Sequence, residues 1–128
     1  MTTTDAPTAP AAAPAGADLS PVLALTSTTF DEAVAAATTP LLVDFTASWC
    51  APCRQLSPVL AELAVDLAGR LAVVEVDIDA NPDLAVRHQV MSAPTLVLYV
   101  DGLVVRTLVG ARSRTRLLDD LADHLALD

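Results

Sequence analysis

Short aliphatic runs alternate with helical patterns along most of this chain, and their order narrows its fold more than any other feature. The predicted strands span 22–25, 41–45, 71–76, 95–100 and 103–109. The predicted helices span about 29–37, 51–68 and 81–88, followed by one on the apolar stripe Leu117, Leu118, Leu121 and Leu125. This order predicts an α/β domain whose parallel half is followed by an antiparallel hairpin, with helices on both faces of the sheet.

Turn and capping signals mark the ends of several of these elements. The pattern Thr29-x-x-Glu32 predicts a capping box at the start of the first helix. Asp101-Gly102 separates the last two strands by two residues, which predicts a tight hairpin turn. Pro58 lies inside the second helix and is expected to kink it, because proline removes a backbone donor and crowds the preceding turn.

Ala, Pro and Thr dominate residues 1–20, which contain no Val, Ile, Phe or Tyr. Such a stretch cannot bury enough apolar surface to offset its ordering entropy, so we expect a disordered tail at 1–20 and one domain at 21–128. The stretch lacks the basic start and continuous apolar run of a secretory signal. No later segment is long and uncharged enough to span a bilayer, so we expect no membrane partner.

The charge balance is strongly acidic. Sixteen Asp and Glu residues face seven Arg and no Lys, which leaves a formal net charge of −9. This balance argues against nucleic acid or an anionic membrane surface as a partner. His88 and His124 lie among polar neighbours and are expected to be solvated and without a role. Two cysteines and two histidines without finger-like spacing do not predict a metal site.

The two cysteines of the chain stand in the motif Cys50-Ala51-Pro52-Cys53, directly after Trp49. Two intervening residues place the sulfurs one helical turn apart, so the pair can alternate between a dithiol and a disulfide. A disulfide that closes so short a loop constrains little of the unfolded chain. The motif therefore predicts a redox catalyst rather than a structural cross-link.

The position of Cys50 at the predicted start of a helix favours its thiolate form. Unpaired backbone amides and the positive end of the helix dipole stabilise an anion there, which predicts that Cys50 is the nucleophile. Cys53, one turn inside the helix, is expected to be less exposed and to resolve the mixed disulfide. Pro52 suits the first turn, where its missing donor costs nothing. The alternative for Cys50 is a buried, inert cysteine.

A set of short motifs resembles the thioredoxin family in order and spacing over about residues 22–127. The motifs are Val43-Asp44-Phe45, Trp49-Cys50-Ala51-Pro52-Cys53-Arg54, Pro58, Asp77-Ile78-Asp79, Asn81-Pro82, Ala93-Pro94-Thr95, Asp101-Gly102 and Val109-Gly110. The combination is far more specific than a lone CxxC. The resemblance implies the thioredoxin fold, in which a central mixed five-stranded sheet is flanked by helices on both faces.

Asp44 is a carboxylate within an aliphatic strand, so burial is expected to raise its pKa. The resemblance implies that it lies behind Cys53 and relays the proton of that thiol. The alternative is a strand-end Asp that caps the next turn. The resemblance also implies that Pro94 is a cis-proline that faces the disulfide and holds a loop that pairs with substrate backbone.

The resemblance further implies an apolar rim that docks client chains. Its members are Trp49, Ala51, Pro52, Ala93, Pro94 and Gly110. For Trp49 the alternative is plain core packing.

Three residues depart from the family pattern. Ala51 replaces the usual glycine between the cysteines, and Thr46 stands where a second aromatic residue is usual. Ala51 adds one methyl group at the docking face, and Thr46 thins the wall beside the active site. Glu75 occupies a position where the family commonly has a lysine near the buried Asp, so the charge beside the proton relay is reversed. If Glu75 lies near Asp44, the two carboxyls are expected to titrate as a coupled pair, whereas the alternative is a Glu75 that points into solvent.

The function that these residues imply is reduction of protein disulfides by thiol–disulfide exchange. The expected partners are disulfide-containing client proteins and a separate thioredoxin reductase, and no bound cofactor is implied. A monomer in the cytoplasm is expected. One alternative is a thioredoxin-fold oxidoreductase with an oxidising or dedicated-client role. Another is a non-catalytic binding module, which would have no need of Cys50, Cys53, Asp44 and Pro94.

Overall fold

The computed structural model describes residues 21–125, so the tail predicted at 1–20 lies outside the described residues. The strands are β1 (Leu23–Leu25), β2 (Leu41–Thr46), β3 (Ala72–Asp77), β4 (Thr95–Val100) and β5 (Leu103–Val109). The helices are α1 (Phe30–Ala36), α2 (Ala51–Asp66), α3 (Pro82–Arg87) and α4 (Arg114–Leu125). Each predicted element is present, and the bounds differ from the predicted ones by a few residues at most.

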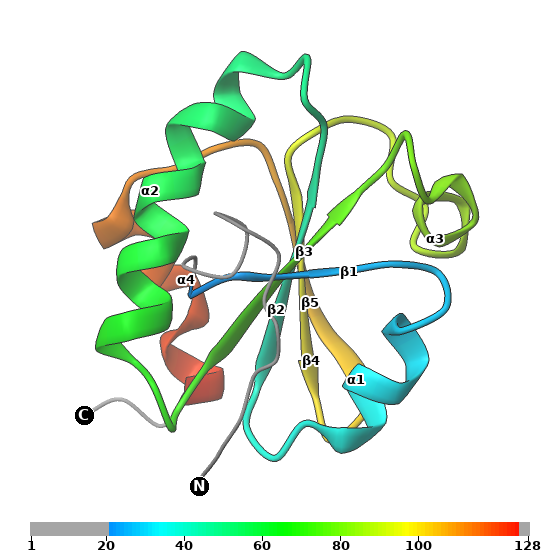
Figure 1. Ribbon diagram of the computed structural model, residues 1–128. Helices are drawn as coiled ribbons and strands as arrows, with labels where there is room; N and C mark the ends of the chain where they lie inside the picture. Colours follow the sequence, from blue (N-terminus) through cyan, green and yellow to red (C-terminus); the bar gives the residue numbers. More distant parts are fainter. Residues whose placement is uncertain (1–20, 126–128) are drawn as a thin grey trace, which may run out of the picture.

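One mixed sheet forms the middle layer, with strands in the order β1-β3-β2-β4-β5. β1 and β2 pair parallel with β3, whereas β4 pairs antiparallel with both β2 and β5. Helices α2 and α4 cover one face of the sheet, and α1 and α3 cover the other (Figure 1). This is the predicted thioredoxin fold, a mixed five-stranded sheet between two helical layers.

Because β2 is buried on both faces, its side chains belong alternately to two cores. The core beneath α2 and α4 is almost entirely leucine and valine, as the low aromatic content requires. Its fully buried members include Leu42, Leu60, Leu63, Leu96, Leu117 and Leu121. The opposite core contains Phe30 and Phe45 among aliphatic side chains. Asp44 therefore faces α2, on the same side of the sheet as Leu42.

The hairpin prediction at Asp101-Gly102 is confirmed. Both residues have positive φ, +53° and +80°, as a two-residue turn with the twist of its strands requires. Helix α2 runs without interruption through Pro58 and is followed by Gly69 at φ +88°.

The predicted capping box at the start of α1 is wrong. Thr29 is the residue before the helix, but its side chain makes no capping hydrogen bond. Its Oγ1 instead accepts the N–H of Thr26 at 2.9 Å, within the turn between β1 and α1. A Thr hydroxyl can accept a hydrogen bond within a tight turn as readily as at a helix end, and here it accepts the bond of the turn.

The prediction that His88 is solvated is also wrong. Its ring packs against Phe30 and Phe45, with centroid distances of 5.2 and 4.8 Å. Nδ1 donates to the carbonyl oxygen of Leu84 at 2.9 Å, and Nε2 is hydrogen-bonded to the hydroxyl of Tyr99. His88 thus has a structural position at the end of α3, with both ring nitrogens hydrogen-bonded.

Candidate active site

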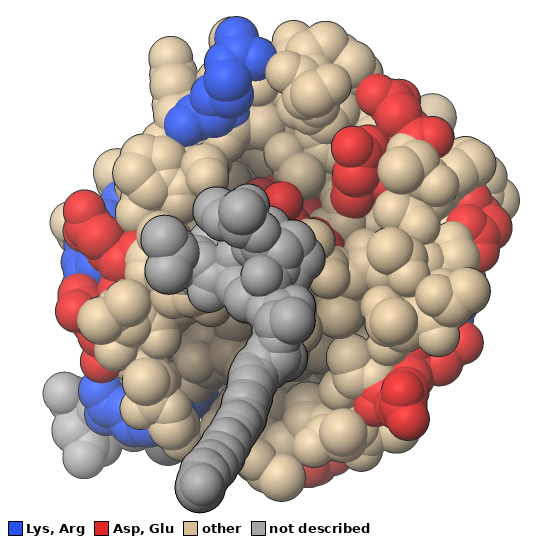
Figure 2. All heavy atoms as spheres, viewed as in Figure 1, with Lys and Arg blue, Asp and Glu red and all other residues tan. Residues whose placement is uncertain are grey.

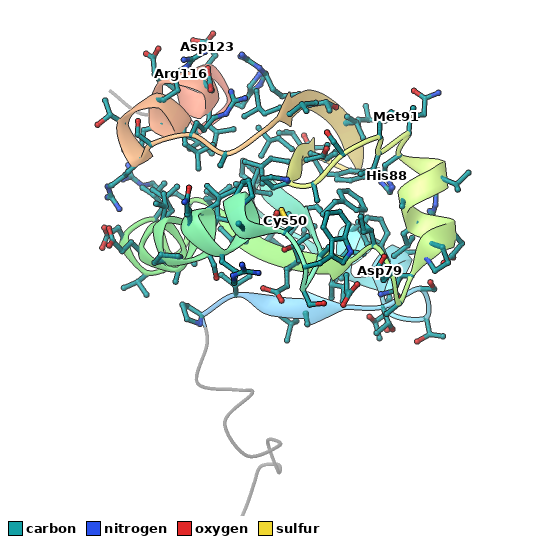
Figure 3. All side chains as sticks on the ribbon, turned by 90° about the horizontal axis from the view of Figure 1, so that it is seen from above. Cys50, Asp79, His88, Met91, Arg116 and Asp123 are labelled. Carbon is teal, nitrogen blue, oxygen red and sulfur yellow. A yellow bond between two sulfur atoms is a disulfide. The ribbon has the colours of Figure 1, made fainter. Side chains whose placement is uncertain are left out.

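Three segments that are distant in sequence meet at one edge of the sheet. β2 and β3 run parallel and end together at the register pair Thr46 and Asp77. β4 runs the other way, so its first residue, Thr95, pairs with Phe45 near the same edge. The loop before α2, the turn after β3 and the loop before β4 therefore converge there. Figure 3 looks onto the molecule from this side, with Cys50 near the middle of the view.

Cys50 and Cys53 form a disulfide in this structure. Cys50 is the residue immediately before α2, and its Sγ accepts the backbone N–H of Cys53 at 3.2 Å. Pro52 lies in the first turn of the helix, where no donor is required of it. A thiolate at Cys50 would be stabilised by the same amide and by the positive end of the helix.

The predicted difference in exposure between the two cysteines is absent from this disulfide form, since Cys50 is 3% and Cys53 2% exposed. Their surroundings differ instead. The Sγ of Cys50 lies 3.4 Å from the carbonyl oxygen of Ala93, in the loop before β4. Cys53 lines a cleft on the other side, together with Asp44. The asymmetry between the cysteines is therefore one of neighbours, not of accessible area.

The peptide bond between Ala93 and Pro94 is cis, as the resemblance implied. Pro94 is buried, and its carbonyl accepts the N–H of Gly110 at 2.9 Å. Gly110 follows β5 with φ +95°, a backbone conformation that favours glycine. These contacts bring the predicted rim residues Ala93, Pro94 and Gly110 together, with Ala93 next to Cys50.

Trp49 is 64% exposed, so the alternative of plain core packing is wrong. Its Nε1 donates to Oδ2 of Asp79 at 2.7 Å, which ties the loop before α2 to the turn after β3. Ala51 and Pro52 are exposed beside it.

Two further residues at this end of the molecule received no role in the sequence analysis. Asp79 holds the indole of Trp49, a contact between residues 30 positions apart that no local pattern signals. Met91 is 92% exposed in the loop that leads to Pro94, and Figure 3 shows it at the rim of the view. The sequence could have indicated Met91 as a surface residue of the site, because it is a large apolar residue in a short loop before a proline.

Asp44 is 4% exposed, and its Oδ1 has no hydrogen-bond partner within residues 21–125. It lies within β2 rather than at its end, and no backbone amide of the described residues bonds to its side chain, so the capping alternative is wrong. Burial is the main cause that raises the pKa of Asp44 to about 7, and the negative charge of Glu75 is the second. A carboxyl group with that pKa can accept or donate a proton near neutral pH.

The cleft behind Cys53 has a volume of about 390 Å³. Its lining residues are Asp44, Thr46, Ala47, Ser48, Cys53, Arg54, Ser57, Glu75 and Asp77. Glu75 is only partly buried, yet it lines the cleft rather than pointing wholly into solvent, and burial followed by the charge of Asp77 raises its pKa. Figure 2 shows acidic atoms in and beside a hollow next to the upper part of α2.

Comparison with known proteins agrees with this geometry. The family model Thioredoxin matches residues 21–123. The chain belongs to the thioredoxin family. It is 42% identical over 104 residues to a thioredoxin of Mycobacterium tuberculosis, which covers 81% of this chain and 90% of that protein. It is 41% identical over 107 residues to Thioredoxin 1 of Synechococcus elongatus, which covers 84% of this chain and all of the relative.

Thioredoxins reduce disulfides by exchange, and this chain has the dithiol that the chemistry needs. It is a thiol–disulfide oxidoreductase that acts on disulfide-containing client proteins through Cys50 and Cys53. A thioredoxin reductase restores the dithiol after each turnover, as is typical of the family. Among residues 21–125, no helix has the length and apolar character needed to cross a membrane.

Proposed function

We propose that Cys50 begins each turnover by attacking one sulfur of a client disulfide. The bond between Cys50 Sγ and that sulfur forms as the client S–S bond breaks, and the departing client sulfur leaves as a thiolate that is then protonated. The support is the position of Cys50 before α2, where the Cys53 amide reaches its sulfur. Charge-assisted hydrogen bonds of this kind stabilise a thiolate over a thiol.

Cys53 completes the reaction, with Asp44 as the group that takes its proton. The Asp44 carboxylate accepts the proton of the Cys53 thiol, and the resulting thiolate attacks Cys50 Sγ. The Cys50–Cys53 bond forms, the mixed disulfide breaks, and the client leaves with two added electrons. The single observation that carries this assignment is the cleft shared by Asp44 and Cys53, which Cys50 does not line.

Client chains dock on the rim formed by Trp49, Ala51, Pro52, Ala93, Pro94 and Gly110. Trp49, Ala51 and Pro52 are exposed next to the disulfide, and the carbonyl oxygen of Ala93 lies beside Cys50. An extended client segment beside the cis-proline loop would present its sulfur in line with the pair. Met91 is also exposed, in the loop that leads to Pro94.

The chain acts as a monomer in the cytoplasm, without a nucleic-acid or membrane partner. A net charge of −9 disfavours binding to polyanions. Its reductase is a separate protein. A relative in Mycobacterium leprae, 41% identical over 99 residues, carries the name bifunctional thioredoxin reductase/thioredoxin, so the two activities occur within one polypeptide in that protein.

The test is reduction of insulin disulfides driven by a bacterial thioredoxin reductase that is supplied with its own reductant. We expect turnover that requires both the reductase and this protein, and none with Cys50→Ser. Failure to exceed the rate of the reductase alone would refute the proposed activity. Faster transfer of the disulfide to a reduced peptide than reduction of insulin would indicate an oxidising role instead.

A further inference from the structure

Two carboxyl groups share the cleft behind Cys53. Asp44 and Glu75 are register partners on the parallel strands β2 and β3, so both side chains project from the face of the sheet that α2 covers. Asp44 is almost fully buried, whereas Glu75 is only partly buried. Both residues line the same cleft, and Glu75 is the one of the two with more contact with solvent.

The neighbouring strands supply no positive charge to this pair. Asp44 pairs with Leu96 on β4, and Glu75 pairs with Ala24 on β1. Asp77, two residues along β3, adds a further negative charge at the rim of the cleft.

Helix α2 brings one cation to the cleft, but that cation is directed elsewhere. Arg54 donates from Nη1 to the carbonyl oxygen of Ser48 at 2.9 Å and makes no ion pair within residues 21–125. The other groups that α2 contributes are the Cys53 sulfur and the hydroxyl of Ser57. The Glu75 carboxylate has neither a hydrogen bond nor an ion pair among the described residues. It remains free to exchange a proton.

We propose that Glu75 is the second carboxyl group of the proton path and passes protons between Asp44 and solvent in every turnover. The inference rests on the role proposed above for Asp44. After Asp44 takes the proton of Cys53, it gives that proton to the Glu75 carboxylate through a water molecule in the shared cleft, and Glu75 releases it to solvent. When the reductase breaks the disulfide, a proton returns along the same path to the Cys53 thiolate. The relay itself moves no electrons.

The same geometry makes Glu75 a positioning residue for the Asp44 proton. Two negative charges in one poorly solvated cleft repel each other, so the ionised Glu75 favours the protonated form of Asp44. Glu75→Gln removes both the charge repulsion and the second proton-carrying group, while it keeps the shape of the side chain. Glu75→Asp keeps a carboxylate at the same strand position, and Glu32→Gln removes an exposed charge from α1 on the opposite face of the sheet.

The resolving step is measured by stopped-flow fluorescence of Trp49, the only tryptophan, with the reduced protein and a saturating peptide disulfide. For Glu75→Gln we expect about a tenfold slower step at pH 7, since removing a proton-transfer group typically costs this much or more. Added imidazole should restore the rate. In Glu75→Gln, the midpoint of the Asp44 carboxyl titration, followed by carbon NMR, should lie at lower pH than in the unmodified protein. Glu32→Gln should behave as the unmodified protein. Glu75→Asp, which keeps a carboxylate, should retain most of the rate that Glu75→Gln loses.

Two results would overturn the relay. One is a Glu75→Gln protein whose rate and Asp44 midpoint match those of the unmodified protein. The other is a slow Glu75→Gln protein that imidazole does not rescue, because a purely structural defect would give that result. Asp44→Asn separates this inference from the proposed function. If Asp44→Asn resolves at full rate, the role of Asp44 itself fails, whatever Glu75 does.

Discussion

Asp44 illustrates how a single residue can be costly to the fold and useful to the reaction. A carboxyl group that is buried with an unpaired oxygen holds its proton to a pH near 7. In the unfolded chain the same group ionises near its ordinary pKa of 3.8. Stability from the protonated group is therefore fully present below about pH 4 and is lost as the pH rises toward 7, since the folded state binds the extra proton.

We expect Asp44→Asn to remove this loss. A pKa raised from 3.8 to about 7 corresponds to about 4 kcal/mol of unfolding free energy. The stability of Asp44→Asn relative to the unmodified protein should therefore rise by about this amount between pH 4 and pH 8, measured by urea unfolding of the disulfide form. Asp119→Asn, an exposed substitution on α4, is the control and should show no such trend. A constant difference between pH 4 and 8 would contradict the assignment.

The two cysteines are predicted to give opposite results when replaced singly. Cys53→Ser should accumulate stable mixed disulfides with clients, because Cys50 beside Ala93 can still attack and nothing resolves the product. Cys50→Ser should form almost none, because Cys53 faces the cleft rather than the rim. Non-reducing gels of protein incubated with an excess of a disulfide client measure both. Equal trapping by the two variants would show that the roles are not divided in this way.

At the scale of elements, the turn between β4 and β5 shows how much a local signal can determine. A two-residue loop with positive φ at both positions needs residues that tolerate it, and Asp101-Gly102 supplies them. A Cβ added at Gly102 would meet no atom within 4 Å. Any cost of a side chain there is a backbone cost alone.

Gly102→Ala should therefore lower the unfolding free energy by about 1 kcal/mol, the usual cost of a left-handed conformation for an alanine. Thermal unfolding and urea unfolding both measure it. Asp101→Gly is the matched control, since it relieves the positive φ of the neighbouring position and should lose little. If the two variants lose the same stability, the turn conformation is not the cause.

Elements with a strong pattern of their own were predictable from the sequence, whereas contacts between elements were not. The strands, the hairpin and the position of Cys50 before α2 follow from patterns within a few residues. The hydroxyl of Thr29 could accept a hydrogen bond from the first turn of α1 or from the preceding turn, and the sequence does not determine which bond forms. His88 and Asp79 depend on Tyr99 and Trp49, which only the tertiary fold brings near.

The candidate site likewise contains features that the sequence predicts and one that depends on contacts between elements. Cys50, Cys53 and the cis-proline were predictable because the motif and the family resemblance define them residue by residue. The equal burial of the two cysteines was not, because it depends on how the loop before β4 covers Cys50.

At the scale of the whole molecule, the ion pairs of the described residues are concentrated at one part of the surface, and the acidic residues near the disulfide are not among them. Four of the seven arginines lie on β5, α4 or the loop between them, where they bind acidic partners. Asp120 alone accepts three of these arginines. The end of the sheet near the disulfide has Asp77 and Asp79 exposed and Arg54 turned to a backbone carbonyl. The docking end therefore carries a negative potential that adds to the net charge of −9.

This potential should select among clients through their rate of encounter. Two peptide disulfides of the same length, one flanked by lysines and one by glutamates, test it in the reductase-driven assay. With the lysine peptide, kcat/KM should fall several-fold as salt rises from about 0.02 to about 0.5 M, because screening shortens the range of the attraction from tens of ångströms to a few. With the glutamate peptide it should rise. A neutral peptide of the same length corrects for any salt effect on the reductase. If all three peptides give the same salt dependence, the acidic docking end does not steer clients, and their selection must depend on the apolar rim around Trp49 instead.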